Sequence, residues 1–445
     1  MKKKFYSLLL VFIFVFSSVG VVSAQVQPDD NHSFLDGVLT INDLFEYEGF
    51  AQLELEAALS SGFTAERLMN QNRSFMYVDA LFDSMPRNRA DEIIFPEYFG
   101  GIYLDSDGNL VITVVESAFA DVRSGDIMRA SELDGISIRL VEFSHSELLD
   151  TIERLIQITP SELAYGECLG FSWWLSERDN RVVVGLFDYG DEQIAWFRES
   201  VLDCATIIFE HSSSVQRYDE ILDDAYVGIE PFVILNPNIN PGRRIYINGG
   251  RLSVGFRVRS IFDSRDVGFV TSPHGRAAWN ADVRVDSLAG STVGRVEGQV
   301  FSGGVDAAFV RLTNIRYAPT NVLPPPIAGN LVPVTRIPIQ GSIIFQVGAT
   351  HAENHPPRTG LMSAEVVSTN ASTRINNVLL HSLIRVIYPH NIPGPTVGDS
   401  GGAVWNPDRT AAGLHAGSFR AQDGTIFGYS VRAGLVLNAL SVEMY

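Results

Sequence analysis

Lysine is nearly missing from this chain of 445 residues. The three lysines are Lys2, Lys3 and Lys4, so every other cationic side chain apart from histidine is an arginine. The arginines of the second half are scattered and form no dense basic run. Proteins that bind nucleic acid usually need such a run to neutralise phosphates, and we therefore expect no nucleic-acid partner.

Cysteine is also scarce, since the chain has two, Cys168 and Cys204. Both lie in the first half, so residues 226–445 have no disulfide to stabilise them. In an exported protein the two cysteines could bond to each other or stay as thiols, and the sequence leaves both possibilities open.

Groups of metal ligands are rare as well. His351 and His355 are four residues apart with Glu353 between them, a spacing that could hold a metal on a helix. Pro356 and Pro357 follow directly and favour a loop instead. We expect neither a metal nor another cofactor.

The first residues indicate export. Lys2 to Lys4 form a basic start, an apolar run covers Leu8–Phe16, and Val22-Ser23-Ala24 has the small residues of a cleavage site. The apolar run is too short to span a bilayer comfortably, which argues against a membrane anchor. We therefore interpret residues 1–24 as a signal peptide and expect a secreted, extracellular protein with no membrane contact after cleavage.

Acidic residues gather in the first half of the chain. Residues 25–225 contain 39 Asp and Glu against 12 Arg, whereas residues 226–445 contain 13 Asp and Glu against 18 Arg. Opposite net charges favour docking of the two halves on each other. The charge pattern equally allows an acidic region that only keeps the chain soluble.

The acidic region mixes helix and strand signals, and we predict an α+β fold for it. Its predicted helices are Ala51–Leu59, a segment beginning near Thr64, Ser144–Ile158 and Asp191–Leu202. Its predicted strands are the hairpin Gly101–Leu104 and Leu110–Val115, followed later by Arg181–Leu186.

From residue 226 the pattern changes to short strands with frequent Gly and Pro, which predicts an all-β domain built as barrels or a sandwich. One helix is predicted, near Val436–Ser441. Leu323-Pro324-Pro325-Pro326 is a stiff connector that divides this half into about 226–322 and 327–445. The predicted strands are Ser253–Arg259, Val267–Thr271, Val293–Val300, Ala307–Leu312, Ile343–Val347 and Ala403–Trp405.

The sharpest chemical signal is Gly398-Asp399-Ser400-Gly401-Gly402, just before an apolar strand. Flanking glycines allow a tight turn that exposes the serine hydroxyl and lets backbone N–H groups converge beside it. A serine hydroxyl is a weak nucleophile and needs a base. A plain Gly-rich turn is the alternative reading of this motif alone.

Two further residues complete a set for nucleophilic catalysis. His274 follows a predicted strand, and Asp306 precedes the apolar strand Ala307–Leu312. Each residue alone would more often be structural. The chain order His, Asp, Ser is the order of chymotrypsin-type enzymes, which makes the combination far more specific than its members.

With these motifs the second half resembles the bacterial chymotrypsin-like serine proteases of the alpha-lytic protease and streptogrisin group. The histidine segment Gly268–His274, the opening strand around Ser253–Phe256 and the segment Gly413–Ser418 carry the likeness, together with the serine motif. The resemblance implies two six-stranded antiparallel β-barrels over residues 226–445. The acidic residues 25–225 are similar in layout to the group's pro-regions.

The resemblance implies roles for single residues. Ser400 would be the nucleophile, His274 the general base and then acid, and Asp306 the group that orients His274. The N–H groups of Gly398 and Ser400 would form an oxyanion hole. Substrate would bind along His415, Ala416, Gly417 and Ser418, whose preference the sequence does not assign.

Three departures from the family pattern stand out. Gly275 replaces the cysteine that usually follows the histidine, Ala416 replaces a serine whose hydroxyl lies near the aspartate, and Ser418 replaces a glycine. Asp399 would be buried and would need a polar or cationic partner, which the sequence does not identify.

The predicted function is therefore a secreted serine endopeptidase, made as a zymogen whose pro-region assists folding and inhibits. We expect protein or peptide substrates, a pro-region docked on the catalytic domain, and a monomer. Cleavage of the link is expected between about His211 and Ile229. A catalytically silent binding protein on the same fold, or an acidic adhesion protein with a chance serine motif, remain the alternatives.

Overall fold

The computed structural model describes residues 52–88, 93–122, 135–158, 171–186, 189–212, 216–217, 237–324, 327, 329–350, 360–376, 378–390, 394–421 and 423–445. The predictions for the signal peptide, for Cys168 and for His351 and His355 lie outside the described residues. Cys204 is described, and its Sγ lies 3.0 Å from Thr206 Oγ1.

The acidic region forms two α+β units, as predicted. In the first unit the helix α4 begins as expected at the cap Thr64, whose Oγ1 accepts a hydrogen bond from Arg67 N at 3.1 Å. The strands β1 and β2 form the predicted hairpin, and β3 adds in parallel to β2. The elements of this unit are α3 (Gln52–Ser60), α4 (Ala65–Ser84), β1 (Phe99–Leu104), β2 (Leu110–Val115), α5 (Glu116–Val122) and β3 (Ile136–Val141).

The second unit packs the amphipathic helix α7 (His145–Ile158) on a three-stranded sheet. Leu148, Ile152 and Leu155 are buried at helical spacing, which confirms the predicted helix over Ser144–Ile158. Burial on both faces explains why Phe171–Ser176 lacks an alternating pattern and was not predicted as a strand. The remaining elements are β4 (Phe171–Ser176), β5 (Arg181–Leu186), α8 (Asp191–Ser200) and β6 (Ile207–His211).

The described residues of the second half are mainly β-strands, and the helix α10 (Ala433–Leu440) begins three residues earlier than predicted. Its first sheet has the strand order β10-β9-β13-β14-β15-β12-β11-β24. The strand β24 therefore pairs with β11 at the end of this sheet of residues 244–312, although the strands that precede it in the sequence belong to the other sheet. The strands are β9 (Arg244–Ile247), β10 (Gly250–Ser253), β11 (Arg257–Ser260), β12 (Val267–Thr271), β13 (Asp282–Val285), β14 (Thr292–Ser302), β15 (Val305–Leu312) and β24 (Val442–Met444). A separate two-stranded sheet pairs β8 (Asn238–Ile239) with β16 (Ala318–Pro319).

The prediction of one strand over Ser253–Arg259 is wrong. β10 ends at Ser253 and β11 begins at Arg257, because the chain leaves β9 and turns to pair with β12. Gly255 sits at this corner and donates its N–H to Val270 O. A Cβ at Gly255 would lie 2.3 Å from Leu414 Cδ2, so the bend needs glycine.

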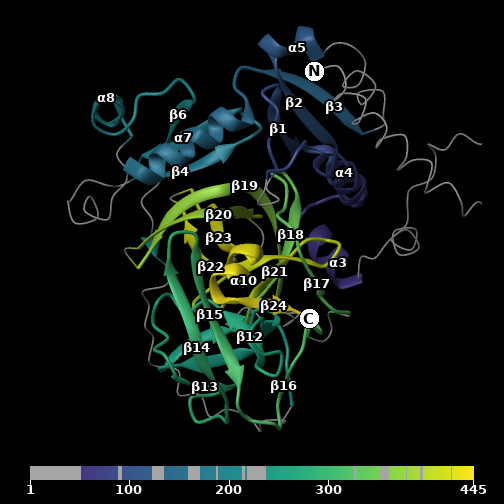
Figure 1. Cartoon of the computed structure of the whole chain (residues 1–445), viewed down its shortest axis with the longest axis vertical. Coiled ribbons are helices and arrows are strands. Elements are labelled where there is room, and N and C mark those ends of the chain that lie inside the picture. Colours follow the sequence, from purple (N-terminus) through teal and green to yellow (C-terminus); the bar gives the residue numbers. More distant parts are fainter. Residues whose placement is uncertain are drawn as a thin grey trace, which may run out of the picture.

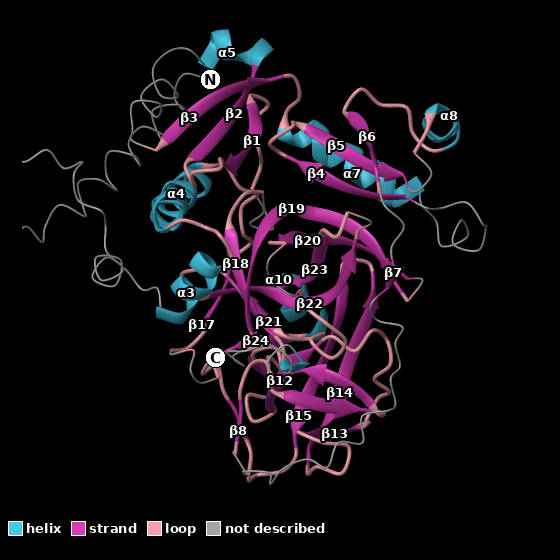
Figure 2. Ribbon diagram, turned by 180° about the vertical axis from the view of Figure 1, so that it is seen from behind, coloured by secondary structure: helices cyan, strands magenta, loops and turns pink. Residues whose placement is uncertain are grey.

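The second barrel contains six strands, β18 to β23, and its sheet continues into the acidic region. β4 pairs with β19 at Trp174 and Ala371, and β7 (Gln216–Arg217) pairs with β22. Figures 1 and 2 show the acidic units, the second barrel and the first barrel following one another along the molecule. The strands are β17 (Val332–Thr335), β18 (Ile343–Val347), β19 (Leu361–Ile375), β20 (Val378–Tyr388), β21 (Ala403–Trp405), β22 (Thr410–Arg420) and β23 (Ile426–Arg432).

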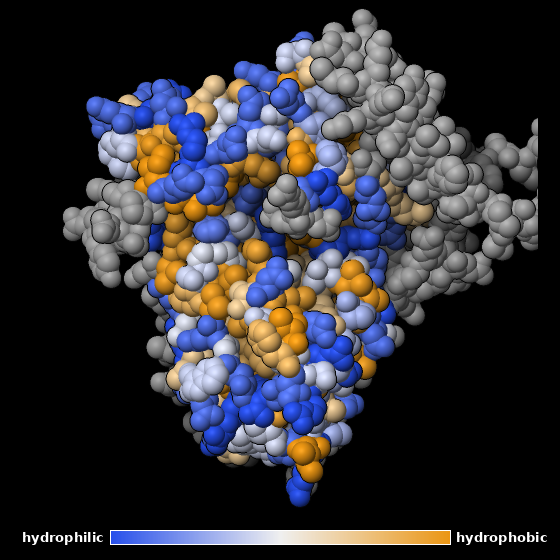
Figure 3. Space-filling model, viewed as in Figure 1, coloured by the Kyte–Doolittle hydropathy of each residue, from blue (hydrophilic) through white to orange (hydrophobic). Residues whose placement is uncertain are grey.

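The predicted fold class is confirmed: an α+β region precedes a two-barrel, chymotrypsin-like β domain. One large core cluster extends from the acidic helices through the second barrel, and a smaller cluster fills the first barrel. On the face drawn in Figure 3, apolar side chains lie in small patches among hydrophilic ones.

A buried carboxyl group lies where the acidic region meets the protease-like half. Glu177 is 8% exposed in the turn after β4, and its side chain packs against Gly101. Burial raises the pKa of Glu177 to about 8, against the opposing effect of Arg432. The carboxyl is therefore neutral over most of the acidic and neutral pH range in the folded chain.

This raised pKa predicts a pH-dependent stability. The unfolded chain releases the proton near pH 4.5, whereas the folded chain keeps it to about pH 8. The contribution of the neutral Glu177 carboxyl to stability is thus fully present below pH 4.5 and is lost as the pH rises toward 8. Between pH 5 and pH 8 the free energy of unfolding should fall by about 3 kcal/mol.

Urea unfolding of the uncut chain at several pH values measures this fall. Glu177→Gln should remove most of it, while Glu199→Gln on exposed α8 should leave it in place. An unchanged pH slope in Glu177→Gln would show that the carboxyl is not the group responsible.

Candidate functional site

The turn before β21 holds Ser400 where the two barrels meet, since Ser253 N of the first barrel donates to Ser400 O at 2.8 Å. Gly398 has φ +97° and Gly401 has φ +86°, values that side chains rarely adopt. A Cβ at Gly401 would lie 2.1 Å from Thr271 Oγ1 on the first barrel. Both glycines of the motif are thus required by the backbone and by the close approach of the barrels.

Asp399 finds its partners in the second barrel. It is fully buried, and its carboxylate accepts hydrogen bonds from the N–H groups of Thr350 and Thr396, both at 2.8 Å. The partner that the sequence could not identify is therefore backbone, which fixes the turn that carries Ser400.

Ser400, His274 and Asp306, the three residues predicted as catalytic, lie close together, each near the end of a different strand. Ser400 Oγ lies 2.8 Å from His274 Nε2, and His274 Nδ1 lies 2.6 Å from Asp306 Oδ2. The N–H of His274 also donates to Asp306 Oδ1 at 2.9 Å. Asp306 is fully buried, and its carboxylate lies against the Nδ1 side of the imidazole.

A fourth residue, which the sequence analysis missed, completes the contacts of Asp306. Ser272 is buried, and its Oγ donates to Asp306 Oδ2 at 2.7 Å. Ala416 leaves no hydroxyl at the position where the family pattern expects one. Ser272 supplies that hydrogen bond from the first barrel, two residues before His274. The signal available in the sequence was the position of Ser272, between the end of the strand Val267–Thr271 and His274.

The backbone around His274 is strained and locally supported. His274 has φ +53° and Gly275 has φ +73°. A Cβ at Gly275 would lie 2.7 Å from Phe301 Cδ1, so glycine makes room for the Phe301 ring. Packing by Phe301 thus occupies the place next to His274 where a cysteine was expected.

The predicted oxyanion donors are not used elsewhere. Among the hydrogen bonds of the described residues, none has the N–H of Gly398 or Ser400 as its donor. The N–H groups of the neighbours are engaged, since Asp399 N donates to Thr396 O and Gly401 N donates to His415 O. This leaves two N–H groups beside the Ser400 hydroxyl for an incoming oxygen.

The predicted substrate-binding residues lie on β22 directly beside Ser400. His415 exchanges backbone hydrogen bonds with Gly401 and Gly402, at 2.8 Å and 2.9 Å. Ser418 Oγ donates to Pro395 O at 3.1 Å. Ala416 and Gly417 lie between them, buried in the same strand.

The imidazole of His415 is 2% exposed, and its Nδ1 has no hydrogen-bond partner among the described residues. Burial and the nearby His274 lower the pKa of His415 to about 3. The ring is therefore neutral at ordinary pH, one ring nitrogen carrying the hydrogen and the other a lone pair.

A strand of the acidic region occupies the edge of β22 next to these residues. Arg217 pairs with Phe419 and Gln216 with Arg420, antiparallel. Along β7 the chain therefore advances from Arg420 toward His415 and Ser400. An extended polypeptide added to this edge would run past the serine hydroxyl in the same direction.

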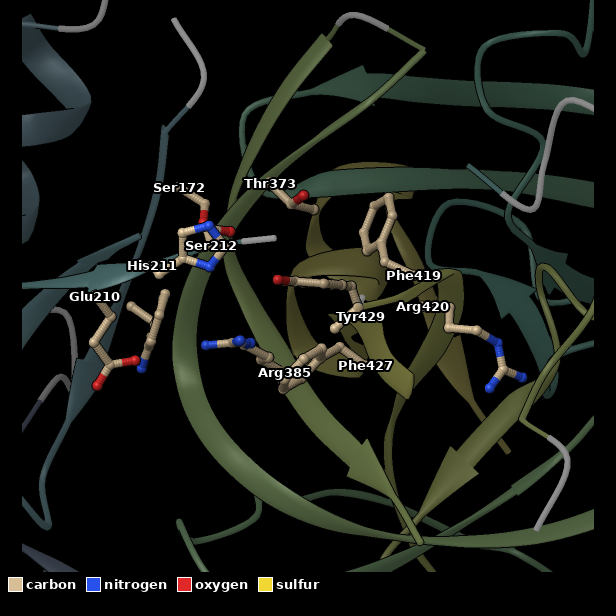
Figure 4. Close-up of a pocket in the computed structure, with 12 residues that line it drawn as sticks. Ser172, Glu210, His211, Ser212, Thr373, Arg385, Phe419, Arg420, Phe427 and Tyr429 are labelled. Atoms are coloured by element: carbon tan, nitrogen blue, oxygen red, sulfur yellow. The ribbon is translucent and has the colours of Figure 1, made fainter. Parts of the chain in front are cut away.

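A cavity of about 130 Å³ lies where the second acidic unit meets the strands β20, β22 and β23 (Figure 4). Arg385 is 9% exposed there, and its Nε and Nη1 are buried without a hydrogen-bond partner among the described residues. Its guanidinium carbon lies 3.8 Å from the Trp174 ring centre and 4.3 Å from that of Phe427. The cation is thus held between one aromatic ring of each half.

Removing this cation should loosen the acidic region. In the processed protein we expect Arg385→Met to speed opening of the contact between β4 and the second barrel by about tenfold, because a desolvated cation–π contact contributes about 1–2 kcal/mol. Hydrogen exchange of the β4 amides measures this opening. Arg420→Met is the matched control, since Arg420 lines the same cavity but is exposed. Equal rates in both variants would contradict the expectation.

The geometry supports one kind of chemistry. A hydroxyl bonded to an imidazole, which is oriented by a buried carboxylate, is an activated nucleophile, and free N–H groups beside it can stabilise an oxyanion. The adjacent edge of β22, where β7 pairs, can hold an extended polypeptide. The arrangement is thus suited to acyl transfer from peptides. No helix among the described residues is both long and apolar enough to cross a bilayer.

Two family models match the acidic region. Residues 60–134 match the Pro-like N-terminal domain, and residues 146–212 match the Pro-like C-terminal domain. These spans fall within the two α+β units of the structure. The similarity to Pro-like domains thus lies ahead of the β domain. No curated protein matches the chain.

Several solved structures are similar to the β domain. Thermobifida fusca protease A is 22% identical, with a TM-score of 0.37, and covers 46% of this chain and 98% of its own. A Nocardiopsis protease is 25% identical, with a TM-score of 0.38, over 46% and 98%. A serine protease described as glutamic acid specific, with a histidine triad in substrate binding, is 24% identical, with a TM-score of 0.38, over 46% and 100%.

Proposed function

We propose that this chain is the zymogen of a secreted serine endopeptidase that cuts peptide bonds through Ser400, His274 and Asp306. The observation that carries the proposal is the continuous chain of hydrogen bonds from Ser400 Oγ through His274 to Asp306, at 2.8 Å and 2.6 Å. The Pro-like domains ahead of the β domain support a protease made as a precursor.

Each catalytic step follows from these contacts. His274 Nε2 accepts the Ser400 proton as the oxygen attacks the scissile carbonyl, and the resulting oxyanion is stabilised by the N–H groups of Gly398 and Ser400. His274 then donates that proton to the leaving amine, which leaves an acyl group on Ser400. Water, activated by the same imidazole, releases the acid and restores the serine.

Asp306 and its neighbours keep the imidazole ready. Because His274 Nδ1 faces a buried carboxylate, its hydrogen stays on Nδ1 and Nε2 remains free to accept. The hydrogen bonds from Ser272 and from His274 N hold the carboxylate beside the ring. Substrate would add to the edge of β22 at Ala416, Gly417 and Ser418, with His415 behind them.

The pro-region would inhibit by occupying the substrate edge. β7 pairs with Phe419 and Arg420 of β22, next to the proposed substrate positions Ala416, Gly417 and Ser418, and it runs in the direction that leads toward Ser400. This supports cleavage of the link after Arg217, within the span that ends at Ile229. Edman sequencing of the processed protein tests this, and a new N-terminus upstream of residue 218 would contradict it.

A fluorophosphonate probe tests the proposed function. The processed protein should be labelled on Ser400, as located by mass spectrometry of peptides, and should hydrolyse denatured protein substrates. Export from an expressing cell and loss of residues 1–24 would be checked on the same sample. A folded, processed protein that neither reacts nor hydrolyses would favour the silent binding protein instead.

A further inference from the structure

The helices α3 and α4 contact the second barrel in a way that differs from the rest of the acidic region. Glu54 on α3 is fully buried, and its Oε1 accepts from Trp405 Nε1 at 2.8 Å. Its Oε2 lies 3.3 Å from Arg409 Nη2. Trp405 is itself fully buried, so a charged side chain of the acidic region satisfies a polar group inside the barrel.

A second contact uses the backbone of the barrel. Gln71 on α4 is fully buried and donates its Nε2 to Ile343 O at 2.9 Å, while its Oε1 accepts from Ile343 N at 2.8 Å. The amide thus pairs with both backbone groups of one residue of β18, as a neighbouring strand would. Without Gln71 these two groups lose the partners that they have in the folded chain.

Apolar packing joins the same surfaces. Leu55, Ala58 and Leu68 have no exposed area and belong to the core cluster that contains Phe345 and Trp405. Side chains at the centre of a barrel core are normally supplied by the barrel itself. Here one layer of that core comes from residues 55–68.

Ion pairs surround this core on its outer side. Arg67 Nη2 lies 2.8 Å from Glu365 Oε2, and Arg336 Nη2 lies 2.6 Å from Asp79 Oδ2. The acidic region supplies the arginine of the first pair and the carboxylate of the second. The contact thus has the buried apolar centre and polar rim of a lasting interface.

The helices lie away from the edge of β22 that substrate would use. Figure 2 shows α3 and β7 at opposite sides of the second barrel. Trp405, which contacts α3, is the last residue of β21, whereas Ser400 lies in the turn before that strand. Freeing the β22 edge therefore does not require the helices to leave.

We propose that α3 and α4, residues 52–84, remain bound to the protease domain after the link is cut, as a second chain of the mature enzyme. The proposal rests on the proposed function, since it concerns the processed protease. The pro-region would then have two attachments with different fates: β7 leaves the substrate edge, and the helix pair stays as an outer layer of the second barrel.

The test is made on the full chain after it has processed itself or been cut by an added protease. Native mass spectrometry and gel filtration at nanomolar concentration should find peptides of residues 52–84 in the same particle as Ser400. Hydrogen exchange should show the backbone amides of α3 and α4 still protected. A fluorophosphonate-labelled particle lacking these residues would overturn the inference while leaving the proposed function intact.

Variants on one helix separate binding from general stability. In Glu54→Ala the Trp405 N–H and the Arg409 charge lose a buried partner, so we expect the helix pair to dissociate on the order of 100-fold faster. Glu56→Ala, on the exposed face of α3, is the matched control and should change this rate less than threefold. Equal rates in the two variants would overturn the inference.

If Glu54→Ala fails to fold as a full chain, Gln71→Ala replaces it. The unmodified protein still decides the question, because protection of α3 and α4 is compared before and after cutting. Loss of that protection on cutting, with fluorophosphonate labelling retained, would show that the helices serve the precursor alone.

Discussion

Ser400→Ala should lower the rate of peptide hydrolysis by a factor on the order of 10⁴ to 10⁶, the range found when the nucleophile of a triad is removed. The reason is that Ser400 Oγ is the hydroxyl bonded to His274 Nε2, at 2.8 Å. The residual rate would come from the Gly398 and Ser400 N–H groups and from binding. The measurement is kcat/KM on a quenched peptide, with fluorophosphonate labelling beside it.

The same variant reports on maturation. If the chain cuts its own link, Ser400→Ala should accumulate as the uncut precursor, with β7 still on β22. Ser291→Ala, at an exposed serine of the first barrel, should label, mature and hydrolyse as the unchanged chain does. Labelling that persists in Ser400→Ala would place the reactive serine elsewhere and remove the basis of the proposal.

Asp306→Asn should lower kcat by about 10⁴-fold with little change in KM. The amide would present N–H₂ to His274 Nδ1, so the ring would place its hydrogen on Nε2 and could no longer accept the Ser400 proton. The buried carboxylate also receives the His274 N–H and the Ser272 hydroxyl, and the amide satisfies these donors less well. Steady-state kinetics at pH 7 to 8 measure the loss.

Ser272→Ala is the graded control for this prediction. It removes one of three hydrogen bonds to Asp306 but leaves the bond at 2.6 Å to His274, so we expect a loss of about tenfold. Thermal unfolding of both variants checks that the β domain stays folded. If Asp306→Asn retained activity within tenfold of the unchanged chain, the orienting role of Asp306 would be wrong.

The departures from the family pattern illustrate how the site tolerates substitution. Ala416 removes a hydroxyl from the second barrel, and Ser272 provides one from the first barrel at 2.7 Å from Asp306. Gly275 stands where the family pattern has a disulfide-bonded cysteine, and the Phe301 ring packs beside Gly275 instead. Neither substitution leaves Asp306 or His274 without support, which agrees with an active enzyme better than with a silent one.

Local chemistry along the chain was enough to predict much of this protein. The apolar spacing of Ser144–Ile158, the turn between Leu104 and Leu110, and the Val-rich Arg181–Leu186 each specify one element through contacts between near neighbours. Gly398 and Gly401 specify the turn around Ser400, because side chains rarely adopt the positive φ angles that the backbone has there. The change of composition near residue 226 likewise separated the α+β region from the β domain.

Tertiary structure decided what depends on residues far apart in the chain. The break at Gly255, the hydrogen bond from Thr350 N to Asp399 and the hydroxyl of Ser272 on Asp306 depend on contacts between residues far apart in the chain. The placement of β24 in the first sheet and of Glu54 beneath Trp405 depends on contacts across 184 and 351 residues of sequence. Local patterns report periodicity and backbone preference, whereas the partner of a buried polar group is set by which surfaces pack together. The sequence by itself therefore determined many of the elements and the candidate catalytic residues, and folding decided how those residues are held.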